Sequence, residues 1–397
     1  MWEGRSITIY VSLRGANVAV ERGVFTALLG ESVVSDRRPY SNALASSSIT
    51  FDKLVELARK AEIPYALFFA PQAVVDTQIK SKLDALLSGV SKDTFSMNSR
   101  SRVRLRDIEL IVKDLLRKQE TLKKLDRTLA KNAVVGSLKS SRGTVIEDAN
   151  RLRAELGFTV ADVKAAKNKE AALDLLIGRF ETRQLLVSQS QLDYMPQRLP
   201  RGVKFSGMCV RDKKIPYLFL TGGDAGDNPE PVGRRIFTLV LLAVLVARGR
   251  FAPVTYDDYT GDPIPNREYE LTEEILMPAA ALAGLDVSTL DAVKECASNH
   301  RVTPSAFTMR ARRLQMISRD TADSYLSQLT AEFAQRPKSQ ARRAKPINAV
   351  RRYSGSEYSR LMFSQLDHGR ISASDFRRVV CLNKLKPNQI EEFRATL

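Results

Sequence analysis

The sequence predicts an α+β fold that is predominantly helical and contains a small β-hairpin or sheet. Three observations predict it. Apolar residues recur at helical spacing along much of the chain, most clearly over residues 104–132. Two short apolar runs within residues 203–221 flank the turn sequence Asp212-Lys213-Lys214 and indicate a hairpin. The longest apolar run, 236–247, is too short for a membrane span, which needs about 20 residues, and it predicts a buried helix.

Length and composition are those of a soluble protein with two or three domains. The 397 residues are 44% hydrophobic and 27% charged, and both values are normal for globular proteins. The cysteines Cys209, Cys296 and Cys381 are far apart and form no CxxC pair, which indicates a reducing compartment. The first residues contain neither a long apolar core nor a small-residue cleavage site. We therefore expect a cytoplasmic protein that has no membrane partner.

The net charge of +17 predicts a polyanionic partner, for which nucleic acid is the default choice. The excess is concentrated in two segments. Residues 98–142 hold 13 Lys and Arg against 5 Asp and Glu, and residues 334–360 hold 8 against 1, giving net charges of +8 and +7. One-sided charge of this kind indicates a phosphate-facing surface, although a charge run often forms only a solvated helix face.

The N-terminal domain is expected over residues 1–75. It begins with a β-like stretch, and it continues through serine-rich sequence to a short helix that Thr50 caps and Pro64 ends. A basic helical segment and linker is expected over 76–143. Its helix carries apolar residues on one face and lysines and arginines on the others, and its last part, AVVGSLKSSRG, has the composition of a linker.

The central domain is expected over residues 144–285. Helices are predicted at 144–156, 160–167 and 169–183, and Gly157 ends the first of them. The hairpin, the apolar helix and a helix that ends in the letters ILMP complete this domain.

Residues 286–334 predict a helix-turn-helix-like segment. Thr303 caps its second helix, Pro304 occupies the first helical position, and three arginines follow. Such helix pairs read the major groove of DNA in many regulators, but they are also common as plain packing units. A basic linker, 335–352, and a helical tail, 353–397, follow.

The candidate nucleic-acid contacts are all basic residues. Their expected role is to bind phosphates, which gives affinity but little choice of sequence. They are Arg102, Arg104, Arg106, Arg117, Lys118, Lys123, Lys124, Arg310, Arg312, Arg313, Arg342, Arg343, Lys345, Arg351 and Arg352.

Groups that would support catalysis are sparse in this sequence. An acidic stretch supplies oxygens for a hard cation, but a solvated loop or an internal partner for the basic segments explains it better, because Ca²⁺ needs about six or more converging oxygens. That stretch contains Asp257, Asp258, Asp262, Glu268 and Glu270. The two histidines, His300 and His368, are expected to be polar surface groups rather than catalytic ones.

Several segments resemble one protein family in the family's own order. FSGMCVRD at 205–212 and KIPYLFLT at 214–221 resemble the hairpin that precedes the active-site helix in the ImmA/IrrE group of metallopeptidases. The letters RIFTL, then EILMP and residues 294–314, match the entry to that helix and two later segments. Residues 49–69 are similar to the end of an XRE-type helix-turn-helix domain fused to these peptidases. The resemblance implies a zincin-like peptidase core and a degenerate XRE-type domain over 1–75.

The zinc-binding motif of that family is missing. An HExxH helix binds zinc through two histidines spaced i and i+4, and its glutamate polarises a metal-bound water. In this register the three positions are Leu241, Leu242 and Leu245. The resemblance therefore implies a non-catalytic pseudopeptidase that has no catalytic residues, no metal and no cofactor. The sequence leaves open whether the leucines fill a closed core or line a groove.

Members of the ImmA/IrrE group occur in phage, mobile-element, toxin–antitoxin and stress or defence settings, where the active ones cleave a repressor or antitoxin. The resemblance implies a regulator that binds nucleic acid, or a protein partner such as a repressor, antitoxin or toxin. Two alternatives stay open. One is a structural subunit that binds an acidic protein partner through its basic segments, and the other is an enzyme with a site relocated to the acidic stretch.

Overall fold

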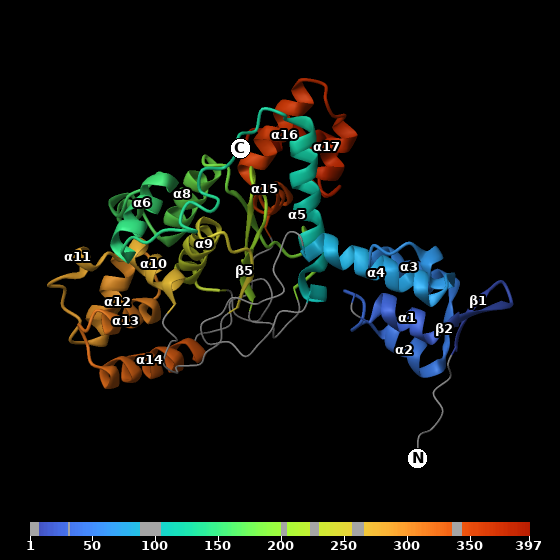
Figure 1. The fold of residues 1–397 in the computed structure, drawn as a ribbon, viewed down its shortest axis with the longest axis horizontal. Helices are drawn as coiled ribbons and strands as arrows, with labels where there is room; N and C mark the ends of the chain where they lie inside the picture. The colour runs from blue at the N-terminus through green and yellow to red at the C-terminus, as the bar shows by residue number, and fades with distance from the viewer. Residues whose placement is uncertain are drawn as a thin grey trace, which may run out of the picture. The chain divides into compact units, whose positions relative to one another are not determined.

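The computed structural model describes residues 8–30, 32–87, 105–199, 205–222, 230–255, 266–335 and 344–397. The fold is α+β and mostly helical, as predicted, and it divides into two compact units (Figure 1). Of the described residues, 8–87 and 105–114 form the N-terminal unit, and those from 115 onward form the C-terminal unit. The helix α5, Leu105–Leu125, contributes residues to both.

The N-terminal unit combines a three-stranded sheet with helices. Its elements are β1 Thr8–Leu13, β2 Ala16–Glu21, α1 Arg22–Leu29, α2 Arg38–Ser46, β3 Ser48–Thr50, α3 Phe51–Lys60, the 3₁₀ helix η1 Tyr65–Phe69, α4 Gln72–Leu87 and the start of α5. The strand order is β2-β1-β3, with β1 antiparallel to β2 and parallel to β3. Arg14 and Gly15 join β1 to β2 with φ angles of 49° and 88°, as the two-residue turns that match the twist of a hairpin require.

This sheet corrects the expectation for the N-terminal domain. The sequence predicted one strand there, and the resemblance to an XRE-type domain implied helices. The second strand, β2 (ANVAVE), is largely exposed, so it does not show the alternating burial of a core strand. The predicted boundary at residue 75 also falls inside α4, which packs against α1. The helix that Thr50 was expected to cap does begin directly after Thr50, and Asp52 lies in its first turn.

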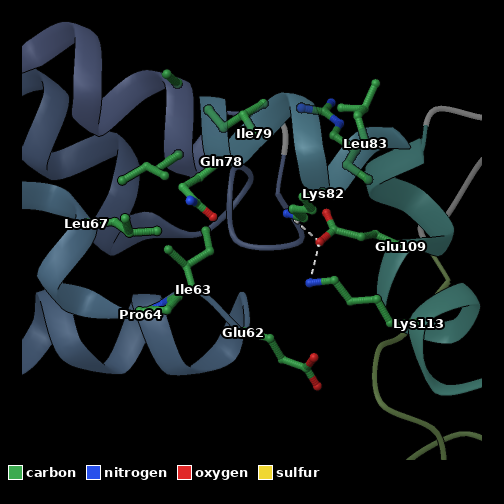
Figure 2. A pocket seen from close by; sticks show the side chains of 13 residues that line it. Glu62, Ile63, Pro64, Leu67, Gln78, Ile79, Lys82, Leu83, Glu109 and Lys113 are labelled. Atoms are coloured by element: carbon green, nitrogen blue, oxygen red, sulfur yellow. Dashed lines mark ion pairs between the residues drawn. The ribbon is translucent and has the colours of Figure 1, made fainter. Parts of the chain in front are cut away.

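The N-terminal unit contains a cavity of about 460 Å³ (Figure 2). Its walls come from α1, the turn after α3, η1, α4 and the first part of α5. Apolar side chains of the unit, including Phe25, Leu54 and Phe68, form a buried core, to which Leu28 and Ile63 of the cavity wall also belong.

The C-terminal unit places helices around a four-stranded sheet. Its elements after α5 are α6 Val145–Leu156, α7 Val160–Ala165, α8 Lys169–Glu181, β4 Leu186–Gln189, β5 Phe205–Val210, β6 Tyr217–Leu220, α9 Val232–Ala247, β7 Pro253–Thr255, α10 Arg267–Leu276, α11 Ala279–Leu282, α12 Leu290–Asn299, α13 Pro304–Arg313, α14 Arg319–Ala334, α15 Pro346–Ser354, α16 Ser356–Asp367, α17 Ala373–Val379, the 3₁₀ helix η2 Pro387–Gln389 and α18 Ile390–Arg394. The strand order is β4-β6-β5-β7.

Local sequence signals set most of these elements. Thr144 and Thr159 form capping boxes at the starts of α6 and α7, and Thr303 caps α13 with Pro304 in its first turn. The predicted hairpin is the antiparallel pair β5–β6, and Asp212 accepts hydrogen bonds from the backbone of its turn, at Lys214 and Ile215. The apolar helix is α9, which contacts α8, α10 and the sheet (Figure 1). Among the described residues, no helix is long and apolar enough to cross a membrane.

Both predicted linkers are corrected in part. In the first, 133–143, the side chains of Val134 and Leu138 are buried in the core. The backbone amides of Gly136 and Leu138 donate to carbonyls at the end of α9, which fixes this segment in place. In the second, 335–352, residues 336–343 lie outside the described part, and α15 occupies the end of the range because its apolar face is buried against β4.

Candidate nucleic-acid interface

The three leucines that the resemblance aligns with the zinc motif lie in a closed core. Leu241 is 1% exposed, and Leu242 and Leu245 are 0% exposed. A Cβ atom on Gly207 of β5 would lie 2.5 Å from the carbonyl oxygen of Phe219 and 3.1 Å from a methyl carbon of Leu242. The hairpin therefore approaches α9 as closely as a glycine allows, and the leucines line no groove.

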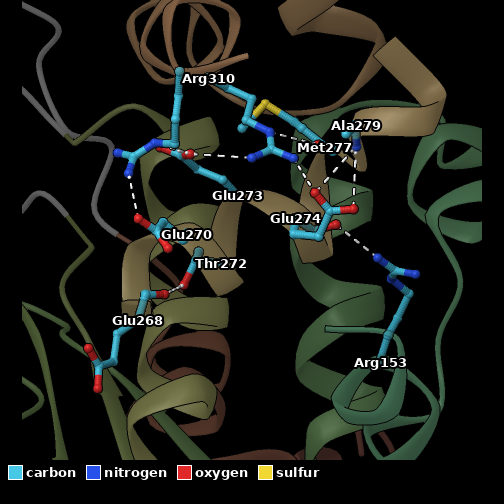
Figure 3. Close-up of polar contacts among 10 residues, drawn as sticks. Arg153, Glu268, Glu270, Thr272, Glu273, Glu274, Met277, Ala279 and Arg310 are labelled. Atoms are coloured by element: carbon cyan, nitrogen blue, oxygen red, sulfur yellow. Dashed lines mark hydrogen bonds and ion pairs between the residues drawn. The ribbon is translucent and has the colours of Figure 1, made fainter. Parts of the chain in front are cut away.

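The arginines of the helix-turn-helix-like segment do not form a surface. Arg310 on α13 is buried, and it makes ion pairs with Glu273 and Glu274 of α10 and donates to the carbonyl oxygen of Met277 at 3.1 Å (Figure 3). Arg313 contacts Glu273 at 3.0 Å. A buried charge is tolerated only when it is paired, so these contacts explain the orientation of α13. The prediction that Arg310 binds phosphate is wrong.

The acidic residues of α10 are the internal partners of arginines. Glu270 contacts Arg313 at 3.3 Å, and Glu268 contacts Arg248 at 3.4 Å and Arg250 at 3.1 Å. Arg312 is mostly buried and lies 3.8 Å from Asp323 of α14. Asp257, Asp258 and Asp262 lie outside the described residues. Within the described residues, no group of three or more His, Cys, Asp and Glu side chains is arranged to hold a metal ion.

The histidines and cysteines do not form a nucleophilic site. His300 is buried against the ring of Phe307, contrary to the expected surface position, and its burial lowers the pKa of the imidazole. His368 is exposed, as expected, with Nδ1 2.6 Å from the carbonyl oxygen of Ser364. Burial raises the pKa of the Cys209 and Cys381 thiols to about 12, which leaves both thiols protonated at neutral pH.

The first basic segment contributes less surface than its charge predicted. Lys118 is 0% exposed, and its Nζ lies 4.2 Å from the centre of the Tyr353 ring and 5.6 Å from that of Tyr358, as cation–π contacts. Its predicted role as a phosphate contact is therefore wrong. Lys123 is held by Asp212 at 2.7 Å and by Glu120 at 2.6 Å.

The other predicted phosphate contacts of the first basic segment range from hydrogen-bonded to exposed. Arg106 belongs to the N-terminal unit and donates to the carbonyl oxygen of Gly30 at 3.2 Å and to the hydroxyl of Ser35 at 3.0 Å. Arg117 and Lys124 are exposed. Arg102 and Arg104 lie outside the described residues.

Three arginines of the second basic segment line one depression of the surface. A depression of about 310 Å³ lies between α8, β4 and the junction of α15 with α16, and Arg351, Arg352 and Arg360 line it. Arg352 is exposed, Arg360 has 52% of its side chain exposed, and Arg351 is half-buried and donates to the carbonyl oxygen of Thr396 at 2.8 Å. We call these three residues the arginine hollow.

The sequence predicted some but not all of the basic residues that this segment exposes. Lys345 is exposed at the start of α15, and Arg342 and Arg343 lie outside the described residues. Arg360 was not among the predicted contacts. It lies within the same charge-rich segment, but only the close approach of α15 and α16 places it beside the other two arginines.

Glu181 lies at the base of the arginine hollow. Its side chain is buried and accepts a hydrogen bond from the backbone N–H of Glu357, in the first turn of α16, at 3.2 Å. Burial raises the pKa of this carboxyl to about 7, even though that hydrogen bond and Arg360 favour the charged form. Glu181 therefore occupies the start of α16 and gains a proton near neutral pH.

This raised pKa makes a pH-dependent contribution to stability. Because Glu181 binds a proton more tightly in the folded chain than in the unfolded one, its stabilising contribution is full below pH ~4.5 and is lost as the pH rises to ~7, a change of about 3 kcal/mol. We expect Glu181→Gln to remove this part of the decline. The free energy of urea unfolding, measured for both proteins from pH 5 to 8, tests it. Parallel profiles for the two proteins would contradict the prediction.

Comparisons of the chain with protein-family models, with curated proteins and with solved structures found no match. The resemblance to the ImmA/IrrE group therefore depends on the quoted sequence segments alone.

Proposed function

We propose that this chain is a non-catalytic protein that binds nucleic acid through the arginine hollow. The observation that carries the proposal is that Arg351, Arg352 and Arg360 face one solvent-accessible depression, where Arg360 also pairs with Glu357 at 3.1 Å. By contrast, Arg310 and Arg313 are held by the acids of α10. Guanidinium groups bind phosphate oxygens with two parallel hydrogen bonds. Three such groups in one hollow suit a nucleic-acid backbone better than a small neutral ligand.

The zincin-like interpretation is part of this proposal. The hairpin and the apolar helix next to it occur in the order that the resemblance to ImmA/IrrE peptidases implies, and the three leucines that the resemblance aligns with the zinc motif are buried. We infer a pseudopeptidase whose central helix serves only the core. In the phage, mobile-element, toxin–antitoxin or stress and defence settings of that group, such a protein would act as a regulator by binding rather than by cleavage.

The salt dependence of binding tests the proposal. Three phosphate contacts predict a slope of roughly −2.7 in log affinity against log salt, which is roughly a 40-fold loss in affinity for duplex DNA between 50 and 200 mM salt. Removing Arg352 and Arg360 by alanine substitution should reduce the slope to roughly −0.9 and the loss to a few-fold. Fluorescence anisotropy with labelled duplex DNA and with single-stranded RNA measures both quantities.

A charge-matched variant provides the control. Arg151→Ala with Lys167→Ala removes two exposed positive charges of the same unit away from the hollow, and we expect it to keep the wild-type slope. Binding that is absent at 50 mM salt, or that both double variants weaken equally, would sink the proposal. A stable acidic protein partner that survives nuclease and high salt would instead favour a structural subunit.

A further inference from the structure

The cavity of the N-terminal unit has the size and lining of a small-molecule site. Its volume of about 460 Å³ lies within the range of roughly 300–1,000 Å³ that such sites occupy. Apolar side chains from α1, the turn after α3, η1 and α4 form most of its wall, among them Leu28, Ile63, Leu67 and Ile79. Figure 2 shows Ile63, Leu67 and Ile79 on one side of the cavity and a charged group on the other.

The charged group consists of two lysines that share one carboxylate. Lys82 of α4 and Lys113 of α5 lie 2.6 Å and 2.9 Å from the same oxygen, Oε1, of Glu109 (Figure 2). The Glu109 side chain is only 3% exposed, whereas those of Lys82 and Lys113 are 31% and 17% exposed. Each ammonium has three N–H donors, so each lysine can donate to a further acceptor in the cavity.

The charge balance of this group favours an anion. Two ammonium groups face one carboxylate, which leaves an excess of one positive charge beside an apolar wall. Arg106, which also lines the cavity, is offset by Asp107 at 3.9 Å. Glu62 is exposed, so water screens its charge and the excess at the two lysines remains. An excess positive charge in a partly desolvated site is stabilised by one anion that accepts hydrogen bonds from it. The cavity therefore suits a ligand with a single negative charge.

We propose that this cavity binds a small amphiphilic carboxylate, a molecule with an apolar body and one carboxylate group. The apolar body lies against Leu28, Ile63, Leu67 and Ile79, and the carboxylate accepts hydrogen bonds from Lys82 and Lys113. The proposal concerns the N-terminal unit alone and does not depend on the arginine hollow.

Calorimetric titration of the full chain with decanoate tests the proposal. We expect saturable binding with one site per chain. Decanol has the same apolar body without the charge, and it should bind about tenfold more weakly, because it forms no charge-assisted hydrogen bond. Equal affinity for the two probes, or no saturable binding of decanoate, would overturn the proposal.

Substitutions locate the site and separate binding from folding. Ile79→Trp fills the cavity and should abolish binding of both probes, whereas Lys113→Met should remove the preference for decanoate. Glu109→Gln removes the internal competitor of the ligand carboxylate, and it should tighten decanoate binding several-fold because both lysines then lack a counter-charge. The control is Lys53→Met, which changes an exposed lysine of α3 and should have no effect.

The Glu109→Gln result is decisive if Lys113→Met fails to fold. A merely structural ion pair would make Glu109→Gln less stable without raising its affinity for decanoate. Unchanged or weaker decanoate binding by a folded Glu109→Gln protein would therefore contradict the proposal, as would undiminished binding by Ile79→Trp.

Discussion

Replacing Arg310 by methionine is expected to lower the free energy of unfolding by about 3–5 kcal/mol, the usual cost of removing one partner from a buried ion pair. The substitution leaves the buried carboxylate of Glu274 facing an apolar side chain, and it leaves Glu273 with Arg313 as its remaining cationic partner. Since whole domains have stabilities of about 5–15 kcal/mol, chemical denaturation will show a large shift of the midpoint.

The pH dependence of the Arg310→Met protein gives a second readout. The carboxylates that lose Arg310 can enter the folded state at low cost only when they are protonated. The loss of stability relative to the wild type should therefore be smaller at pH 5 than at pH 8. Adding Glu274→Gln to Arg310→Met should restore part of the stability, because it removes one of the uncompensated charges.

An exposed arginine is the matched control for this experiment. Arg352→Met should change stability by less than about 0.5 kcal/mol while it weakens nucleic-acid binding. The reverse pattern would contradict our assignment: if Arg310→Met weakened DNA binding and left stability unchanged, α13 would be a DNA-reading helix after all.

Truncating Leu242 to alanine is expected to cost about 2–5 kcal/mol, as in other cores where the cavity cannot collapse. Leu242 is fully buried, and one of its methyl carbons would lie only 3.1 Å from a Cβ on Gly207, so the two elements already pack closely here. Leu242→Glu should prevent stable folding because it buries a carboxylate without a partner.

Thermal and urea unfolding measure the effect of Leu242→Ala. Leu192→Ala is the control, since Leu192 is 45% exposed, and its substitution should cost less than about 0.5 kcal/mol. A groove that accepts a partner would give a different outcome, in which Leu242→Ala is tolerated and a soluble Leu242→Glu protein is obtained.

The elements with local signals were predictable from the sequence. Capping residues such as Thr144 and Thr303 predict the starts of their helices, because their side chains accept hydrogen bonds from backbone N–H groups three residues later. The turn at Asp212 and the continuous apolar run of α9 predict the hairpin and the buried helix in the same way. Of the sheet in the N-terminal unit only the first strand, β1, was predicted, since β2 is mostly exposed and β3 is only three residues long.

The candidate site was less predictable, because the environment of a basic residue depends on distant segments. Arg310 is enclosed by acids of α10 that lie 36 and 37 positions earlier in the sequence, and Lys118 is covered by tyrosines of the C-terminal helices. A charge count cannot distinguish such a residue from Arg352, which is exposed. Only the packing of α15 beside α16 brings the three arginines of the arginine hollow together.

The junction of α15 and α16 also bears on self-association. β4 is the outermost strand of its sheet, and a bare strand edge is a template on which a second chain can add a strand. Gly355 lies so close to β4 that a Cβ there would be 2.6 Å from the carbonyl oxygen of Val187, so the junction covers this edge. At the opposite edge, β7 has only three residues and begins with Pro253, which lacks a donor. Loss of the last four helices would leave the β4 edge open to fibre-like aggregation.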